Sequence, residues 1–187
     1  MRTSWEEVSA QIAGCTKCPL ANMGRTHIVP GEGNMNADLM FIGEGPGQEE
    51  DKQGRPFVGP SGMLLTKMIE AMGMERKDVY IANIVKCRPP GNRNPLPEEA
   101  EACLPHLRAQ FALIRPKIVV LLGKIACTYT VGNISVMREH GKWIEKKGVL
   151  FMPTFHPSAL LRDPALKRAA WEDLKKVRDR LKELAEG

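Results

Sequence analysis

The chain has 187 residues, a length typical of one compact domain, and we expect a single domain over residues 1–187. Hydrophobic residues make up 43%, which excludes a disordered chain, and the net charge of +5 favours a polyanionic partner only mildly. The longest apolar runs, 118–122 and 149–152, are far shorter than the roughly 20 residues of a membrane span. The N-terminus lacks the apolar core of a signal peptide, so we predict a cytoplasmic protein without membrane contact.

The expected elements alternate between short strands and helices. A helix is predicted first, over residues 5–13. Strands are predicted over residues 39–42, 79–82, 118–122 and 149–152. Further helices are predicted over residues 62–72, 97–114, 124–129 and 164–184. This alternation is typical of an α/β fold, in which a parallel sheet has helices on both faces.

Three side chains capable of chemistry lie at the ends of predicted strands. They are Glu44, Asn83 and His156. In parallel sheets, ligands bind beyond the carboxyl ends of the strands. We therefore expect these residues, which are far apart in the sequence, to meet in one crevice and form an active site.

Two segments resemble nucleotide-binding loops but lack their requirements. The glycine-rich loop 43–47 is followed by the acids Glu49, Glu50 and Asp51, which would repel a pyrophosphate. Gly123 and Lys124 are not followed by the Ser or Thr of a Walker loop. Nucleotide binding is therefore not predicted.

The five cysteines divide into a group of four and one outlier. Cys15 and Cys18 form a closely spaced pair, and Cys87 and Cys103 lie in segments rich in proline and charge. Disulfides are not expected in the cytoplasm, and four thiolates suit either zinc or an iron–sulfur cluster, between which the spacing does not choose. Cys127 lies in an apolar helical stretch and is expected to be a buried thiol.

Four motifs are specific when taken together. They are Gly-Glu-Gly-Pro-Gly at 43–47, Gly-Arg-Pro-Phe-Val-Gly at 54–59, Asn83, and His-Pro-Ser-Ala-Leu-Leu-Arg at 156–162. With the cysteine pattern they resemble the family 4 uracil-DNA glycosylases, from about residue 15 to residue 162. The resemblance implies a three-layer α/β/α sandwich with a four-stranded parallel sheet. It also implies a monomer that excises uracil from double- or single-stranded DNA and initiates base excision repair. The implied cofactor is a [4Fe–4S] cluster on Cys15, Cys18, Cys87 and Cys103.

The resemblance also assigns the residues that hold the base. Gly45 and Pro46 are expected to contact the substrate, and Phe57 to stack on the uracil ring. The Asn83 amide would donate to uracil O4 and accept from N3–H, a pattern that cytosine reverses. His156 would donate to O2 as negative charge builds on the leaving base.

Two carboxylates are candidates for the remaining catalytic work. Glu44 is expected either to stabilise the oxocarbenium-like sugar or to orient the attacking water. Glu50 is a second acid candidate, and the sequence does not rank the two. Glu49 and Asp51 are expected to be solvated.

The segment after His156 suits insertion into DNA. The leucine pair offers an apolar wedge, and the flanking residues can contact phosphate; the residues are Ser158, Leu160, Leu161 and Arg162. One leucine of the pair could instead pack in the core. Further phosphate contacts are predicted for Lys86, Arg88 and Arg93.

Three other functions compete with excision. An iron–sulfur uracil binder that traps DNA through a loop histidine is disfavoured, because loop 88–95 has no histidine and His106 lies inside a helix. A non-enzymatic iron–sulfur DNA-binding module, such as a polymerase accessory, would not need the residues at the strand ends. A zinc-binding protein would also leave those residues unused.

Overall fold

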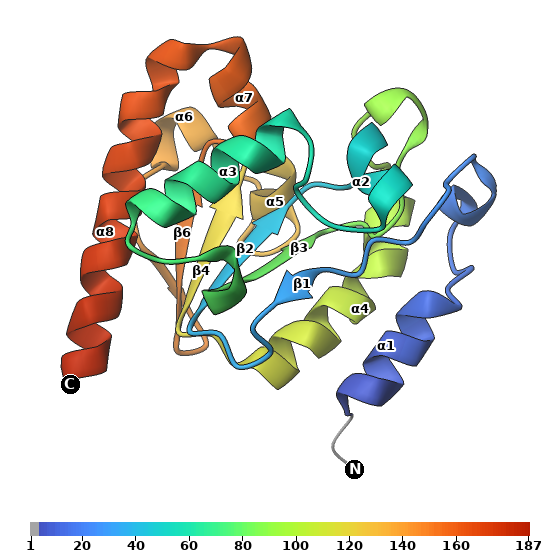
Figure 1. Cartoon of the computed structure of the whole chain (residues 1–187), viewed down its shortest axis with the longest axis horizontal. Coiled ribbons are helices and arrows are strands. Elements are labelled where there is room, and N and C mark those ends of the chain that lie inside the picture. The colour runs from blue at the N-terminus through green and yellow to red at the C-terminus, as the bar shows by residue number, and fades with distance from the viewer. Residues whose placement is uncertain (1–3) are drawn as a thin grey trace.

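A computed structural model describes residues 4–187 and contains one six-stranded sheet in the order β1-β3-β2-β4-β6-β5 (Figure 1). Its parallel strands are β3 (Tyr80–Asn83), β2 (Leu39–Gly43), β4 (Ile118–Leu122) and β6 (Val149–Thr154). The antiparallel edge strands are β1 (Glu32–Gly33) and β5 (Ile144–Lys146). The predicted four-stranded parallel sheet is confirmed as the centre of a larger mixed sheet. The edge strands were not predicted, because strands this short carry no alternating pattern.

Helices form a layer on each face of the sheet. The α-helices are α1 (Trp5–Ala13), α2 (Gln48–Gln53), α3 (Pro60–Ala71), α4 (Pro97–Ile114), α5 (Lys124–Thr128), α6 (Val136–Glu139), α7 (Pro157–Arg162) and α8 (Lys167–Glu186). Short 3-10 helices are η1 (Pro19–Asn22), η2 (Arg76–Asp78), η3 (Pro90–Asn92) and η4 (Pro164–Leu166). The predictions over 5–13 and 97–114 match α1 and α4, whereas α2, α6 and α7 were not predicted.

The two helical layers follow from side-chain alternation along the buried strands. In β2, Met40 and Ile42 pack in one core cluster with side chains of α4 and α5. Leu39 and Phe41 point the other way and pack with side chains of α3, α7 and α8. Both faces of β2 are fully buried, so the strand reads as a continuous apolar run. The predicted three-layer α/β/α arrangement is confirmed.

Helix boundaries follow local capping chemistry. Ser4 Oγ accepts from the Glu7 backbone N–H at 3.2 Å, and the Glu7 carboxylate accepts from the Ser4 N–H at 3.4 Å, which forms a capping box at the start of α1. Pro97 occupies the first turn of α4, where its missing N–H has no helical partner to lose. Helix α4 ends at Ile114 because Arg115 takes a left-handed conformation.

The register brings the carboxyl ends of the parallel strands to one edge. Gly43 at the end of β2 pairs with Asn83 at the end of β3, and Leu122 of β4 pairs with Thr154 of β6. The loops that follow these strands therefore converge, as a functional site in this fold class requires.

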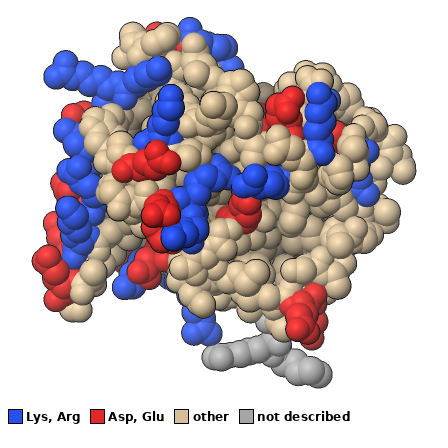
Figure 2. Space-filling model, in the orientation of Figure 1, with Lys and Arg blue, Asp and Glu red and all other residues tan. Residues whose placement is uncertain are grey.

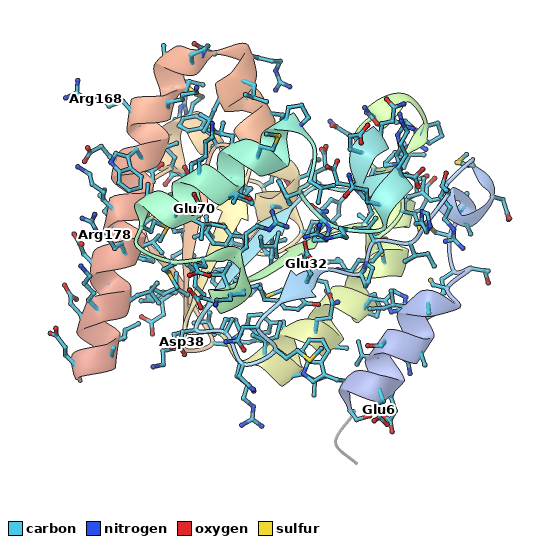
Figure 3. All side chains as sticks on the ribbon, viewed as in Figure 1. Glu6, Glu32, Asp38, Glu70, Arg168 and Arg178 are labelled. Atoms are coloured by element: carbon cyan, nitrogen blue, oxygen red, sulfur yellow. The ribbon has the colours of Figure 1, made fainter. Side chains whose placement is uncertain are left out.

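The surface carries mixed charge. On α8, basic and acidic side chains alternate along the exposed side, which agrees with a solvated helix face (Figure 2). Arg168 and Arg178 project outward from this helix (Figure 3). Across residues 4–187, no helix is long and apolar enough to cross a membrane.

Candidate active site

A cavity of about 580 Å³ opens where the parallel strands end. This volume lies within the roughly 300–1,000 Å³ of small-molecule sites. Predicted site residues that line it are Glu44, Gly45, Pro46, Glu50, Phe57, Asn83, His156, Ser158 and Arg162. The structure therefore brings together residues from every predicted motif except the cysteines. The predicted DNA contacts that do not line the cavity are Leu160, Leu161, Lys86 and Arg88.

Asn83 presents a buried acceptor to this cavity. Its side chain is 2% exposed, and Oδ1 has no hydrogen-bond partner among residues 4–187. A Cβ atom at Gly43 would lie 2.6 Å from this oxygen and 2.5 Å from Phe57 Cζ, so glycine is needed at the end of β2. Because an unsatisfied buried acceptor costs about 1–3 kcal/mol, Asn83 is suited to receive an N–H from a ligand.

Phe57 forms a wall of the cavity from a strained backbone. Its φ is +50°, in the left-handed region that residues other than glycine rarely adopt. Its ring lies 5.5 Å from the His156 ring, at an interplanar angle of 32°. A Cβ at Gly62 would collide with the Phe57 backbone, so the loop lies directly on the first turn of α3.

Glu50 is engaged by three backbone amides. Its carboxylate accepts from the N–H groups of Gly47 at 3.0 Å, Val58 at 3.0 Å and Gly59 at 2.6 Å. These bonds cap α2 and hold the residues that follow Phe57. The structure thus gives Glu50 a structural role, which does not support its prediction as a second catalytic acid.

Glu44 is the free carboxylate of the site. It follows β2 directly, and its side chain makes no hydrogen bond within the described part of the chain. Burial raises the pKa of Glu44, while the nearby Arg162 guanidinium opposes that shift. The carboxylate is therefore available to a water molecule or to a sugar.

His156 is held as a neutral hydrogen-bond donor. Its Nδ1 accepts from the Ser158 N–H at 3.1 Å and lies 2.8 Å from Ser158 Oγ. Burial, aided by the Arg162 charge and opposed by Glu50, lowers the pKa of His156 to about 4. With Nδ1 occupied as an acceptor, the proton of the neutral ring resides on Nε2, which can donate to a ligand.

The sequence was compared with those of known proteins and protein families. A model of the uracil DNA glycosylase superfamily matches residues 30–175. The type-4 uracil-DNA glycosylase of Thermotoga maritima is 47% identical over 184 residues, which cover 95% of this chain and 94% of that protein. The type-4 enzyme of Sulfurisphaera tokodaii is 45% identical over 186 residues, covering 94% and 84%. A type-5 uracil-DNA glycosylase of Pyrobaculum aerophilum is 28% identical over 189 residues, covering 83% of each chain.

The chain belongs to the type-4 uracil-DNA glycosylases. The family resemblance inferred from the motifs is thereby confirmed.

The two leucines predicted as a DNA wedge lie in different surroundings. Leu160 is fully buried in the core between α3 and α8, so its prediction as a DNA contact is wrong. Leu161 is 43% exposed on another side of α7, because consecutive helical residues point about 100° apart.

In this family member, the four grouped cysteines line one small cavity between α1, η1 and α4. Their sulfurs have polar neighbours: Arg25 Nη1 lies 3.0 Å from Cys87 Sγ, and the Lys86 backbone N lies 3.3 Å from Cys103 Sγ. Within residues 4–187, no three metal-binding side chains are placed to hold a single metal ion. The fifth cysteine, Cys127, is fully buried in the apolar core, as predicted.

Sequence reasoning missed two residues beside these thiols. Arg25 also donates to the Cys15 carbonyl at 3.1 Å, and His106 Nε2 lies 3.2 Å from Cys15 Sγ. Arg25 carried no sequence signal beyond its proximity to the first cysteine pair. His106 lies one helical turn from Cys103 on α4, a spacing that places both on one face.

Two polar residues depart from their predicted surroundings, and a third, Arg93, does not. Lys86 is 2% exposed and its Nζ donates to the Asn83 carbonyl at 3.1 Å, so it does not contact phosphate. Asp51 is 4% exposed and accepts from the Thr26 N–H at 2.8 Å, so it is not solvated. Arg93 lines the cavity but also forms a 2.8 Å ion pair with the buried Glu99.

Proposed function

We propose that this protein removes uracil from DNA by hydrolysing the N-glycosidic bond, the first step of base excision repair. The observation that carries the proposal is a buried, unpaired acceptor on Asn83 that shares a cavity with a neutral histidine donor. A base must leave the helical stack to reach such a cavity.

Recognition of uracil follows from the polarity of Asn83. Its Oδ1 would accept from uracil N3–H and its amide nitrogen would donate to O4. Cytosine presents an acceptor at N3 and a donor at N4, so both contacts would become repulsive. Gly45 and Pro46 would border the base, and Phe57 would stack on its face.

His156 would stabilise the departing base. Its Nε2–H would donate to uracil O2, where negative charge develops as the glycosidic bond breaks. A donor of this kind, fixed before the reaction begins, is worth about 3–4 kcal/mol. The Arg162 charge, which acts on both Glu44 and His156, would add to this stabilisation.

Glu44 would act on the sugar side of the bond. Its unengaged carboxylate would orient the attacking water or stabilise the oxocarbenium-like transition state. On the DNA side, the exposed Leu161 would enter the base stack, and Ser158 and Arg162 would border it.

We further propose that Cys15, Cys18, Cys87 and Cys103 hold a [4Fe–4S] cluster. The proposal is supported by their common cavity and by the donors Arg25 and Lys86 N–H beside the sulfurs. Thiolates in iron–sulfur proteins accept such hydrogen bonds. The cluster would join three separate segments of the chain. We also propose that the protein acts as a monomer.

The test is uracil release from a labelled oligonucleotide with one uracil, followed by alkali to cleave abasic sites. Wild type should cleave at uracil but not at cytosine or thymine. Asn83→Ala and His156→Ala should each slow cleavage by at least about a hundredfold. Asn36→Ala, which changes an exposed asparagine, is the matched control.

Two outcomes would contradict the proposal. Uracil-DNA binding without release would support a binder that lacks turnover. Equal activity of Asn83→Ala and Asn36→Ala would remove Asn83 from the site. Sedimentation of the free protein and of its DNA complex would test the monomer.

A further inference from the structure

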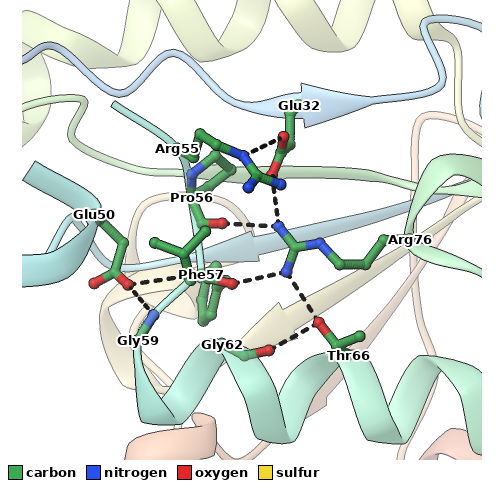
Figure 4. Close-up of polar contacts among 10 residues, drawn as sticks. Glu32, Glu50, Arg55, Pro56, Phe57, Gly59, Gly62, Thr66 and Arg76 are labelled. Atoms are coloured by element: carbon green, nitrogen blue, oxygen red, sulfur yellow. Dashed lines mark hydrogen bonds and ion pairs between the residues drawn. The ribbon is translucent and has the colours of Figure 1, made fainter. Parts of the chain in front are cut away.

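One guanidinium outside the cavity holds the backbone that carries Phe57. Arg76 Nη1 donates to the Phe57 carbonyl at 2.7 Å, and Nη2 donates to the Pro56 carbonyl at 2.8 Å (Figure 4). Nη1 also donates to Thr66 Oγ1 at 3.2 Å, and that hydroxyl donates to the Gly62 carbonyl of α3 at 3.0 Å. The Arg76 side chain is 19% exposed, so most of it is covered by neighbouring residues.

The Phe57 loop needs such support because its backbone is strained. A residue with a large side chain keeps a left-handed φ of +50° only where surrounding contacts enforce it. Glu50 binds the amides of Val58 and Gly59 on one side of the loop, while Arg76 binds two successive carbonyls on the other. The strained residue is thus held between an anion that binds the two amides after it and a cation that binds its own carbonyl and the one before it.

Glu32 fixes the orientation of the guanidinium. Its Oε1 accepts from Arg76 Nη2 at 2.7 Å, and its carboxylate also accepts from Arg55 Nε at 3.1 Å and Nη2 at 3.0 Å. Glu32 lies on β1 near the middle of the molecule in the view of Figure 3. Burial acts to raise the pKa of Glu32, but hydrogen bonds from both arginines outweigh it and leave the pKa below its usual value. Glu32 is therefore a carboxylate at neutral pH.

We propose that Arg76 is a positioning residue for uracil excision, because it fixes the loop that places the Phe57 ring in the cavity. The inference rests on the proposed function, since it takes uracil as the ligand that stacks on this ring. Arginine is required because its planar fork reaches two carbonyls and a carboxylate at once, whereas a lysine ammonium is a single point charge.

Arg55 offers a matched control. It shares the Glu32 carboxylate with Arg76 and is also an arginine, but its side chain is 54% exposed and its hydrogen bonds go to Glu32 alone. Loss of Arg55 removes an ion pair and leaves the Pro56 and Phe57 carbonyls bound. Loss of Arg76 frees them.

The experiment compares Arg76→Met, Arg76→Lys and Arg55→Met with wild type in two assays. The first measures single-turnover excision, and the second measures inhibition by free uracil, which reports on the base site without DNA. Displacement of a reacting group by about 1 Å costs on the order of a hundredfold. Arg76→Met should therefore slow excision roughly ten- to a hundredfold and weaken uracil inhibition. Arg76→Lys should not restore either value, and Arg55→Met should retain both.

A double-mutant test separates positioning from general destabilisation. In a Phe57→Ala background, Arg76→Met should slow excision little further, because the ring that it positions is absent. An equal slowing by Arg76→Met with and without Phe57, or equal behaviour of Arg76→Met and Arg55→Met, would overturn the proposal. Absence of uracil release from wild type would instead refute the proposed function.

Glu32→Gln provides a second variant in case Arg76→Met does not fold, as judged by circular dichroism. It keeps the shape of the side chain and weakens the orientation of the guanidinium. Weaker uracil inhibition than in Arg55→Met is expected. Identical inhibition in Glu32→Gln and Arg55→Met would contradict a role for the guanidinium orientation.

Discussion

A backbone amide determines the chemistry of His156. Because the Ser158 N–H donates to Nδ1 at 3.1 Å, the neutral ring must carry its proton on Nε2. The same turn begins α7, with His156 as its N-cap. One local motif therefore starts a helix, fixes a tautomer and aims a donor into the cavity. Since burial lowers the pKa of His156 to about 4, this donor stays neutral across the physiological range.

The two ionisable catalytic residues should separate in the pH dependence of excision. Glu44 must be ionised to act, and burial raises its pKa, so the rate should fall as pH decreases through that raised value. His156 would be charged only near pH 4 and should not contribute to this decrease. We expect Glu44→Gln to be slow and to lose the acidic limb of the single-turnover profile, whereas His156→Asn should be slow and retain it.

The outcome that contradicts this assignment is specific. If Glu44→Gln retains the acidic limb and His156→Asn loses it, the histidine is the group that titrates. Its Nε2–H would then not be the permanent donor that the Ser158 contact indicates.

At the scale of elements, two adjacent leucines of α7 have different roles, one in the core and one at the surface. Leu160 is fully buried, whereas Leu161 is 43% exposed. Leu160→Ala should lower the free energy of unfolding by about 2–5 kcal/mol, because it leaves a cavity in the core. Leu161→Ala should leave stability nearly unchanged and slow excision from double-stranded DNA more than from single-stranded DNA.

Chemical denaturation measures the stability of both variants, and single-turnover excision measures their activity on single- and double-stranded DNA. The two substitutions delete the same atoms at neighbouring positions, so each is the control for the other. Equal slowing on single and double strands by Leu161→Ala would exclude a wedge at this position.

The sequence predicts the elements of this fold better than the edges of its sheet. Strands such as 118–122 are continuous buried apolar runs, so the apolar pattern and the glycine or polar residues that end it suffice to predict them. Strand β1 spans only Glu32–Gly33 and exists because it pairs with β3, a contact invisible to local pattern. The same limit applies to Arg76, whose function depends on a loop 19 residues away in sequence.

Residues of the candidate site could be predicted where their position at a strand end indicates a function, and less well where their role depends on burial. Asn83 and His156 were found because strand ends converge in a parallel sheet. Lys86 and Asp51 were misplaced, because charge suggests exposure unless a partner is known. Both are buried and bound to backbone groups: Lys86 donates to the Asn83 carbonyl, and Asp51 accepts from the Thr26 amide.

At the scale of the whole molecule, the cysteines connect the N-terminal segment to the sheet. Cys15 and Cys18 lie between α1 and η1, Cys87 follows β3, and Cys103 lies on α4. Helix α1 otherwise rests on α4 through its small apolar face. A cluster on these residues would close two long loops of the chain and reduce the entropy of the unfolded state.

Loss of one cysteine should therefore destabilise the fold far more than its size implies. Cross-links that close loops of tens of residues stabilise proteins by about 3–5 kcal/mol, and we expect Cys18→Ser to lower the free energy of unfolding by a similar amount. The variant should also lose the visible absorbance of an iron–sulfur chromophore. Hydrogen exchange should accelerate first in α1 and η1, because Cys15 and Cys18 lie between these two elements.

Cys127→Ala is the matched control, because Cys127 is a fully buried cysteine that does not line the cavity of the other four. It should retain the chromophore and lose only the small packing contribution of a sulfur atom. Excision per folded molecule should persist in Cys18→Ser wherever the protein stays folded, since the cavity residues belong to other elements. Equal stability of the two variants would show that the cysteine cavity binds no cross-linking group, and the four thiols would then be ordinary packing residues.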